Sequence, residues 1–434
     1  MVNKKILFIF IIAFALRMLF LVFFSQPQIG LDGQWYNRVA ESITEGQGFS
    51  VNGAPTAYTV PAYPIFLAAI YKLFGPNVNW VFTFQIFLGT INCVLIYIIT
   101  RKLFNEKIAL FSGIIASFYY FFIKCENMIL TEAIFMPMVT LSIFLLIKLK
   151  ETKKMQYVIL CSLSLALATL TRSVLFLFPF LLIGLDLVFN LRIFNERFEF
   201  RKLKRMIVFI IVFLLPISFW TYRNYKVFNA FVPLATEGGH AFYFSYHPKN
   251  GKIFGVAYPD KTSKEILKNS SEIEQNRLFM QAAIRSIKED PIRALKYIGL
   301  KNMYFWSVFD WEILGLEGIY NFSTAFILPF FFFGTCWLFF LKDKRPFIFL
   351  LLPIIYIYAM NIIFMGLPRN RYTGEQFMII IASFCMVRLF EIFKQKGIYV
   401  FSVLCWLGFN IYLFINSSVT KEWFKLFFER INLW

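Results

Sequence analysis

The sequence is short of the residues that usually build metal centres and cofactor sites. It contains 2 His, and none of its 6 Cys form a CxxC pair. All the cysteines except Cys125 lie inside apolar runs, which is typical of small core residues rather than of disulfides or metal ligands. Walker, Rossmann, HExxH, GxSxG and DxD patterns are also absent. These absences argue against a nucleotide-sugar enzyme that holds a metal with paired Asp residues.

Charged residues are scarce too, at 16% of the chain, whereas 59% of the residues are hydrophobic and 20% are aromatic. This composition excludes a soluble globular domain, and repeated apolar runs of about 20 residues indicate a polytopic helical membrane protein. The net charge of +19 would indicate a nucleic-acid partner in a soluble protein. Here Lys and Arg instead crowd the short loops on one side of the membrane. We therefore predict membrane lipids, and no nucleic acid, as partners.

The apolar runs predict an all-α polytopic membrane protein with about eleven transmembrane helices. The first run follows Lys4 and Lys5 but lacks a clear small-residue cleavage site, so we interpret it as a retained span. The positive-inside rule places the N-terminus in the cytoplasm. We expect the chain to be a multi-pass protein of the cell membrane. No internal repeat is visible, which argues against the common secondary-transporter folds. The expected spans are 6–24, 79–100, 107–123, 129–148, 156–170, 174–190, 206–221, 319–341, 347–366, 375–393 and 397–416.

This topology divides the chain into four regions. Residues 1–220 form an N-terminal transmembrane module whose first outer loop, 25–78, is long enough to form a site. Residues 221–318 form a small outer-face subdomain, with a helix from Ser271 to about Asp290 that is broken at Pro291 and resumes to Trp306. The remaining regions are the C-terminal transmembrane helices, 319–416, and an amphipathic tail, 417–434, expected to lie in the membrane interface.

The first outer loop begins with a lone acid, Asp32, at the expected outer membrane surface. A carboxylate at this depth is costly unless it faces water or a partner, which makes it a functional hypothesis, although an N-cap of the following helix is the alternative. That helix is amphipathic and carries Tyr36 on its apolar face. The segment 58–75 predicts a second, interfacial helix, because it is short for a span and begins with Pro61 and Pro64.

Further acids and cations gather at the same expected depth. Glu126 and Glu132 flank the start of the fourth span, where they either cap the helix or supply a second acid for acceptor or metal binding. Guanidinium groups clamp phosphate oxygens, and each outer-face Arg is either such a clamp or a cation that snorkels to the interface. These arginines, which oppose the positive-inside bias, are Arg172, Arg223, Arg369 and Arg371.

The segment 234–248 combines two Gly, aromatic residues and both His, at 240 and 247. No Cys or dense carboxylate set accompanies these His residues, so we expect a Gly-hinged aromatic loop that lines a lipid or sugar pocket rather than a metal site. We predict no cofactor. A divalent metal is possible, but the sequence does not support one.

Several of these segments together resemble the glycosyltransferase C superfamily. The first loop, with Asp32, GQGF at 46–49 and PAYPIFLAAIYKLFG at 61–75, is similar to the first outer loop of its branch of dolichyl-phosphate-mannose–protein mannosyltransferases and aminoarabinose lipid A transferases. The segments LTEAIF at 130–135, LTRSV at 170–174, RNYKVFNAFVPLATEGG at 223–239 and PRNRY at 368–372 follow in the order of the family. Many relatives carry a second acid where this chain has Gly33, and some carry an acid and a Lys where it has Thr59 and Val60.

The resemblance implies an inverting transferase that moves a sugar from a polyprenyl monophosphate to a lipid, glycan or protein acceptor on the outer face. Asp32 would be the catalytic base. The four outer-face arginines would bind the donor phosphate. The acceptor and sugar pocket would contain Tyr36, Tyr58, Glu126, Glu132 and His240.

Two other functions stay open. A lipid or sugar-lipid transporter would also need outer cations and a polar cavity, but it should bury charges at the membrane midplane. A non-catalytic relative could act as an assembly factor, since the second acid and the Lys of the family are missing.

Overall fold

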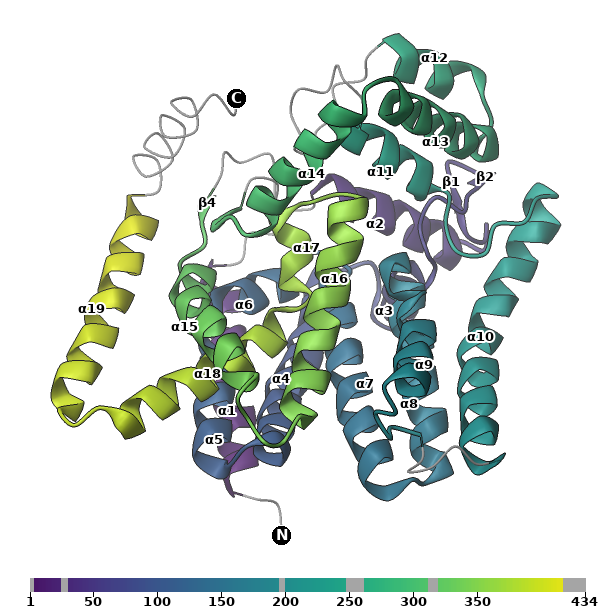
Figure 1. The fold of residues 1–434 in the computed structure, drawn as a ribbon. Coiled ribbons are helices and arrows are strands. Elements are labelled where there is room, and N and C mark those ends of the chain that lie inside the picture. The colour runs from purple at the N-terminus through teal and green to yellow at the C-terminus, as the bar shows by residue number, and fades with distance from the viewer. Residues whose placement is uncertain (1–3, 25–29, 195–199, 247–260, 311–318, 417–434) are drawn as a thin grey trace.

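The computed structural model describes residues 4–24, 30–194, 200–246, 261–310 and 319–416. Within them the chain is predominantly helical, which confirms the predicted helical class. The strands form two short antiparallel pairs, β1 (Ser50–Val51) with β2 (Ala54–Pro55) and β3 (Phe309–Asp310) with β4 (Ile319–Tyr320). Figure 1 shows a broad bundle of upright helices with a layer of smaller helices across its upper end.

Each of the predicted spans coincides with a helix or a helix pair. Five described helices are long and apolar enough to cross a membrane, and a sixth span results if α5 and α6, which meet at a 51° bend, count as one. The count of eleven therefore stays a prediction. The bounds are α1 Lys4–Phe24, α4 Val78–Leu103, α5 Glu106–Phe118, α6 Tyr120–Glu126, α7 Glu132–Thr152, α8 Met155–Thr171, α9 Phe178–Val188, α10 Phe200–Phe228, α15 Phe322–Leu338, α16 Leu352–Ile363, α18 Glu375–Ile392 and α19 Lys396–Ile415.

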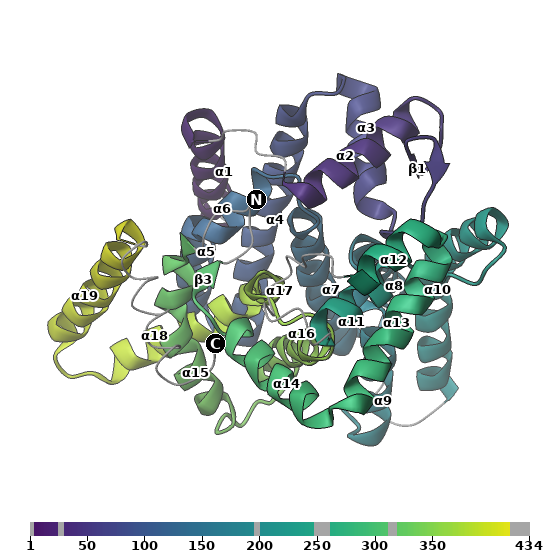
Figure 2. The same ribbon diagram turned by 90° about the horizontal axis from the view of Figure 1, so that it is seen from above.

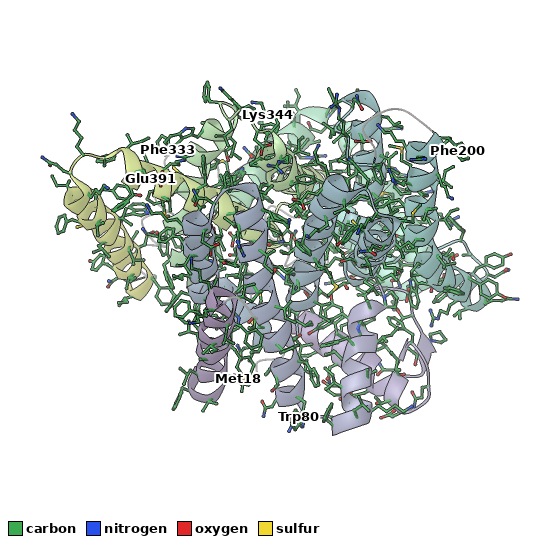
Figure 3. The ribbon with its side chains drawn as sticks, turned by 90° about the horizontal axis from the view of Figure 1, so that it is seen from below. Met18, Trp80, Phe200, Phe333, Lys344 and Glu391 are labelled. Atoms are coloured by element: carbon green, nitrogen blue, oxygen red, sulfur yellow. The ribbon has the colours of Figure 1, made fainter. Side chains whose placement is uncertain are left out.

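The outer circumference of the bundle is apolar, as expected of a surface that faces lipid. Phe200 and Phe333 lie at the rim in Figure 3, and their exposed fractions are 81% and 69%. Helix α19 stands apart from the body at the left of Figure 1 and packs on α15 and α18. The Tyr320 hydroxyl, which donates to the buried Asn410 amide oxygen at 2.6 Å, anchors α19 to β4.

The basic loops gather at the lower end of Figure 1, which we call the basic end. Lys102 pairs with Glu151 at 2.7 Å, joining the ends of α4 and α7. Arg101 pairs with Glu106 at 2.9 Å, and Lys5 pairs with the same carboxylate at 3.2 Å. The segments that the positive-inside rule groups together are thus neighbours in space. Which side of the membrane this end faces stays a prediction.

The opposite end, which we call the subdomain end, carries the first loop and the later helices, seen from above in Figure 2. The Ser271 capping box begins α13, and Asp290 and Pro291 separate α13 from α14, as the sequence analysis predicts. The tail 417–434 and the segment 311–318 lie outside the described residues. The helices here are α2 Leu31–Thr44, α3 Ala62–Phe74, α11 Glu237–Tyr246, α12 Lys261–Asn269, α13 Glu272–Glu289, α14 Pro291–Phe305 and α17 Pro368–Tyr372.

Helices α2 and α3 form the two expected helices of the first loop. The apolar face of α2 buries Val39 and Ala40, and Ala40 packs in one cluster with Tyr63 and Leu67 of α3. The alternative role of Asp32 as an N-cap is wrong, because Gly30 is the N-cap and Asp32 lies inside the first turn. In that turn the carboxylate still benefits from the positive end of the helix dipole, and its side chain remains available for other partners.

Candidate active site

Two acids and two arginines meet at the subdomain end, and we call them the Asp32 cluster. They are Asp32 of α2, Glu132 at the start of α7, Arg172 after α8, and Arg369 of α17. Arg369 donates from Nη1 to Asp32 Oδ2 at 2.6 Å and from Nε to Glu132 Oε1 at 2.6 Å. Arg172 Nη1 lies 2.8 Å from the same Glu132 Oε1. The structure therefore brings four of the predicted site residues into one network.

Glu132 is the centre of the cluster. Its side chain is fully buried, and it holds both guanidinium groups. Arg172 also donates to Thr131 Oγ1 at 3.0 Å and to Asn370 Oδ1 at 2.9 Å. The sequence neighbours of Glu132 and Arg369 therefore also bind the Arg172 guanidinium. A buried carboxylate with two cations fixes both guanidinium planes, which are the groups that bind phosphate oxygens in a bidentate way.

Local backbone features aim these side chains inward. Helix α8 ends at Thr171, and Arg172 takes an extended conformation before the 3₁₀ turn Ser173–Leu175, so its side chain leaves the helix axis. Pro368 starts α17 without requiring a backbone donor, which places Arg369 in the first turn. Both arginines thus lie in the short segments that connect apolar helices, Arg172 in an extended residue and Arg369 in the five-residue helix α17.

Exposure rises across the cluster from Glu132 to Asp32. The side chains of Arg172 and Arg369 are 19% and 17% exposed, whereas that of Asp32 is 52% exposed. Among the described residues, only Arg369 bonds to the Asp32 carboxylate, through Oδ2. Asp32 Oδ1 therefore remains available to an incoming group, with two fixed cations behind it.

Aromatic residues of the predicted pocket lie beside Asp32. Burial first, then the nearby charges of Asp32 and Glu237, hold the pKa of Tyr36 far above its usual value, so its hydroxyl is a donor. Burial and then the Glu237 and Asp32 charges likewise raise the pKa of Tyr58. The Tyr58 ring lies 5.1 Å from Trp35 and 6.2 Å from His240 between ring centroids. Burial lowers the pKa of His240 to about 4, so this imidazole is neutral at pH 7.

Glu237 is a carboxylate near this group that sequence analysis did not single out. It is the first residue of α11, and its N–H donates to the Tyr58 carbonyl at 3.2 Å. Burial raises the pKa of Glu237 to about 7, with Arg172 opposing and Asp32 reinforcing that shift. The signal was present, because Glu237 lies in the family-like segment LATEGG, but no motif marked it as an acid of the site.

Arg223 is held away from the Asp32 cluster by the first loop. Its Nη1 and Nη2 donate to the carbonyls of Thr56 and Phe49, both at 2.7 Å. The guanidinium also lies 5.6 Å from the Phe49 ring centroid and 5.1 Å from that of Trp220. In this structure Arg223 therefore fixes the loop rather than presenting free donors to a phosphate.

The structure also does not bring Glu126 and Arg371 to the cluster. Glu126 is buried against Arg17 of the first span, with Nε and Oε2 2.5 Å apart. Arg371 is 1% exposed and pairs with Glu375 at 3.0 Å. An uncompensated buried charge is costly, so each group is committed to its own partner. In this structure Glu126 is therefore not a pocket acid and Arg371 is not free to bind a phosphate, which were the roles predicted for them.

Within the described part of the chain, no three His, Cys, Asp or Glu side chains form a group that could hold a metal ion. The expectation of no metal remains a prediction.

A family model described as dolichyl-phosphate-mannose–protein mannosyltransferase matches residues 57–220. The match contains Glu132 and Arg172 and runs from the first loop into α10. It confirms the resemblance to the glycosyltransferase C superfamily that the motifs predict. No curated protein matches the chain.

Solved structures of an archaeal oligosaccharyltransferase show a similar fold over nearly the whole chain. The oligosaccharyltransferase AglB from Archaeoglobus fulgidus, in complex with an inhibitory peptide and a dolichol-phosphate, has a TM-score of 0.58 at 12% identity, covering 96% of this chain and 55% of AglB. The A. fulgidus oligosaccharyltransferase with Zn and sulfate also has a TM-score of 0.58 at 12% identity, with coverage of 96% and 53%. This chain thus spans about half the length of those proteins. ArnT from Cupriavidus metallidurans bound to undecaprenyl phosphate has a TM-score of 0.44 at 11% identity, covering 89% of this chain and 78% of ArnT.

Proposed function

We propose that this protein is an integral-membrane glycosyltransferase that moves a sugar from a polyprenyl monophosphate to an acceptor at the subdomain end. The observation that carries the proposal is the Asp32 cluster: a half-exposed carboxylate backed by two arginines that a buried Glu132 holds in place. A base beside fixed cations suits a reaction that needs proton removal and phosphate departure at adjacent points. The family match and the shared fold support the same class of donor.

In the proposed reaction Asp32 accepts the proton of an acceptor hydroxyl or amine. The acceptor lone pair forms a bond to the anomeric carbon from the face opposite the phosphate, which inverts that centre. The bond between the anomeric carbon and the phosphate oxygen breaks, and its electron pair leaves with the polyprenyl monophosphate. Arg369 and Arg172 stabilise the charge that develops on that oxygen. Arg369 already contacts Asp32, so the two functions lie within one hydrogen-bonded unit.

Arg223 and Arg371 enter this proposal only if the bound donor draws them from their present partners. Tyr36 and Tyr58 lie near Asp32, and the His240 ring contacts Tyr58. These three residues would line the acceptor and sugar pocket. The sugar, the acceptor and the placement in the cell membrane with the subdomain end outside are parts of the proposal.

Turnover of defined donors tests the proposal. The purified full chain in liposomes would receive glucosyl, mannosyl, galactosyl and arabinosyl polyprenyl monophosphates, and release of polyprenyl monophosphate would be measured. We expect one donor to turn over and Asp32→Asn to lose about 10³-fold or more of that turnover. The matched control is Asp343→Asn, which removes an exposed acid at the basic end.

Three results would contradict the proposal. Near wild-type turnover by Asp32→Asn would show that another group is the base. Movement of intact lipid-linked sugar across the liposome membrane without bond cleavage would indicate a transporter. Donor binding with no cleavage and no movement would indicate a non-catalytic assembly factor.

The orientation has a separate test. Glu45 is exposed at the end of α2, and Glu45→Cys can be tested in a background where the exposed Cys336 and Cys405 are replaced by Ser. We expect an impermeant thiol reagent to label this cysteine from outside intact cells. Labelling only after the cells are opened would reverse the orientation.

A further inference from the structure

We infer that Glu237 is an acceptor-positioning residue that binds the hydroxyls of a saccharide acceptor opposite Asp32. This inference rests on the proposed function and adds the class of acceptor. It concerns a carboxylate from the subdomain, whereas the proposed base comes from the first loop.

The backbone holds Glu237 against the first loop. The N–H groups of Thr236 and Glu237 donate to the carbonyls of Ala57 and Tyr58 at 3.0 and 3.2 Å. Thr236 Oγ1 also donates to Glu272 Oε1 at 2.8 Å, and that oxygen accepts from the Ala57 N–H at 2.8 Å. Backbone hydrogen bonds to residues 57–58 and the contact with Glu272 at the start of α13 therefore fix where the Glu237 side chain begins.

The Glu237 side chain lies within electrostatic reach of the reaction centre. Its carboxyl interacts with the charges of Arg172 and Asp32, and it influences the hydroxyls of Tyr36 and Tyr58. Among the described residues, none donates a hydrogen bond to its carboxylate. Arg172 is already engaged by Glu132, Thr131 and Asn370. A partly buried carboxylate without a donor, next to a base and a phosphate site, is suited to receive donors from a substrate.

The rings around Glu237 favour a sugar as that substrate. Trp35, Tyr58 and His240 form a chain of edge contacts, and Tyr58 is the residue whose carbonyl accepts the Glu237 N–H. Aromatic rings offer an apolar surface for the C–H face of a sugar ring, while a carboxylate accepts hydrogen bonds from its vicinal hydroxyls. His240 is neutral, so it can accept or donate a hydrogen bond without adding charge. This combination fits a saccharide better than an extended peptide, which needs a backbone edge to pair with.

Transfer to defined acceptors tests the inference. The full chain in liposomes would be given its active donor with octyl glucoside, octyl mannoside or octyl galactoside as saccharide probes, and with a Ser/Thr-rich peptide as the alternative. We expect transfer to at least one glycoside. Glu237→Gln should raise the KM for that glycoside about tenfold, which corresponds to the loss of one charge-assisted hydrogen bond. The donor KM should not change, and Glu237→Asp should recover part of the loss.

The pH profile separates a role in binding from a structural role. The pKa of Glu237 lies near 7, so its carboxylate form increases as the pH rises through 7. Because the carboxylate accepts the acceptor hydroxyls, kcat/KM for the glycoside should rise across that range, and Glu237→Gln should remove the rise. The charges that act on Glu237 are those of Asp32 and Arg172, and the hydroxyls on which its own charge acts are those of Tyr36 and Tyr58. His240 follows Glu237 on α11, and Glu272 accepts a hydrogen bond from the neighbouring Thr236. The two tyrosines stay protonated and His240 stays neutral near pH 7, so none of these three produces the rise.

Two controls keep the outcomes distinct. Glu265→Gln removes an exposed acid of α12 and should leave both KM values unchanged. Donor cleavage by the wild type, with water as acceptor, reports the proposed function by itself. Transfer to the peptide alone, donor cleavage without transfer to any glycoside, or an unchanged acceptor KM in Glu237→Gln would each overturn the inference. If the wild type cleaved no donor at all, the proposed function itself would be overturned.

Discussion

The strongest prediction concerns Glu132, because two arginines depend on it. Glu132→Gln keeps the shape of the side chain but removes the charge that faces Arg369 at 2.6 Å and Arg172 at 2.8 Å. Removing one partner of a buried ion pair costs about 3–5 kcal/mol. The two guanidinium groups retain 17% and 19% exposure, and Arg369 keeps Asp32, so part of the charge can be solvated again. We therefore expect a loss of about 2–3 kcal/mol in the free energy of unfolding.

The same substitution should weaken donor binding. Arg369 donates to Glu132 from both Nε and Nη2, and the Gln amide keeps only one acceptor oxygen, so one of the two bonds that fix the guanidinium angle is lost. We expect the donor KM to rise about tenfold, while the protein still folds and inserts. Thermal unfolding in detergent and the donor KM in liposomes measure the two effects. Glu151→Gln, which breaks the partly exposed pair with Lys102 at the basic end, is the control. If Glu132→Gln matched this control in both assays, Glu132 would not organise the arginines.

Three further predictions concern Arg371, Arg223 and His240. Arg371→Ala leaves Glu375 buried without its cation, so it should lower the thermal unfolding temperature sharply, whereas the donor KM of the surviving folded protein should stay near that of the wild type. Arg223→Ala frees the carbonyls of Thr56 and Phe49, so limited proteolysis should cleave the first loop faster, and Arg223→Lys should restore only part of the protection because it cannot bridge both carbonyls. Because the pKa of His240 is lowered to about 4, the imidazole stays neutral from pH 5.5 to 8. His240→Gln should therefore leave the shape of the pH profile of turnover unchanged over that range. An inflection near pH 6.5 in the wild type that disappears in the variant would contradict this.

Local signals predicted much of the fold. The break between α13 and α14 at Asp290 and Pro291 needs only an N-cap, a Pro and the apolar spacing, all of which act within a few residues. The apolar face of α2 is equally local, since helical periodicity alone determines which side can be buried.

The partners inside the site could not be predicted in the same way. Asp32 and Arg369 are 337 residues apart, and no single sequence shows that their side chains meet. Arg369 and Arg371 seemed equivalent in PRNRY, but residues two apart on a helix point about 200° away from each other. One therefore faces Asp32, while the other faces Glu375. The position of Glu126 at the start of the fourth span predicts a pocket acid, but its partner is Arg17, a cation inside the first apolar run and 109 residues away.

The Glu272 carboxylate has a consequence for how the protein is made. It accepts hydrogen bonds from the Ala57 N–H at 2.8 Å and from Thr56 Oγ1 at 2.6 Å, across 215 and 216 residues of chain. A ribosome that adds about 5–20 residues per second needs roughly 10–40 s to travel that distance. During this interval α2 and α3 have already been synthesised, but residues 56–57 lack the contact that fixes them. The loop that carries Asp32 therefore gains these contacts only after the helices from α1 to α10 have been synthesised.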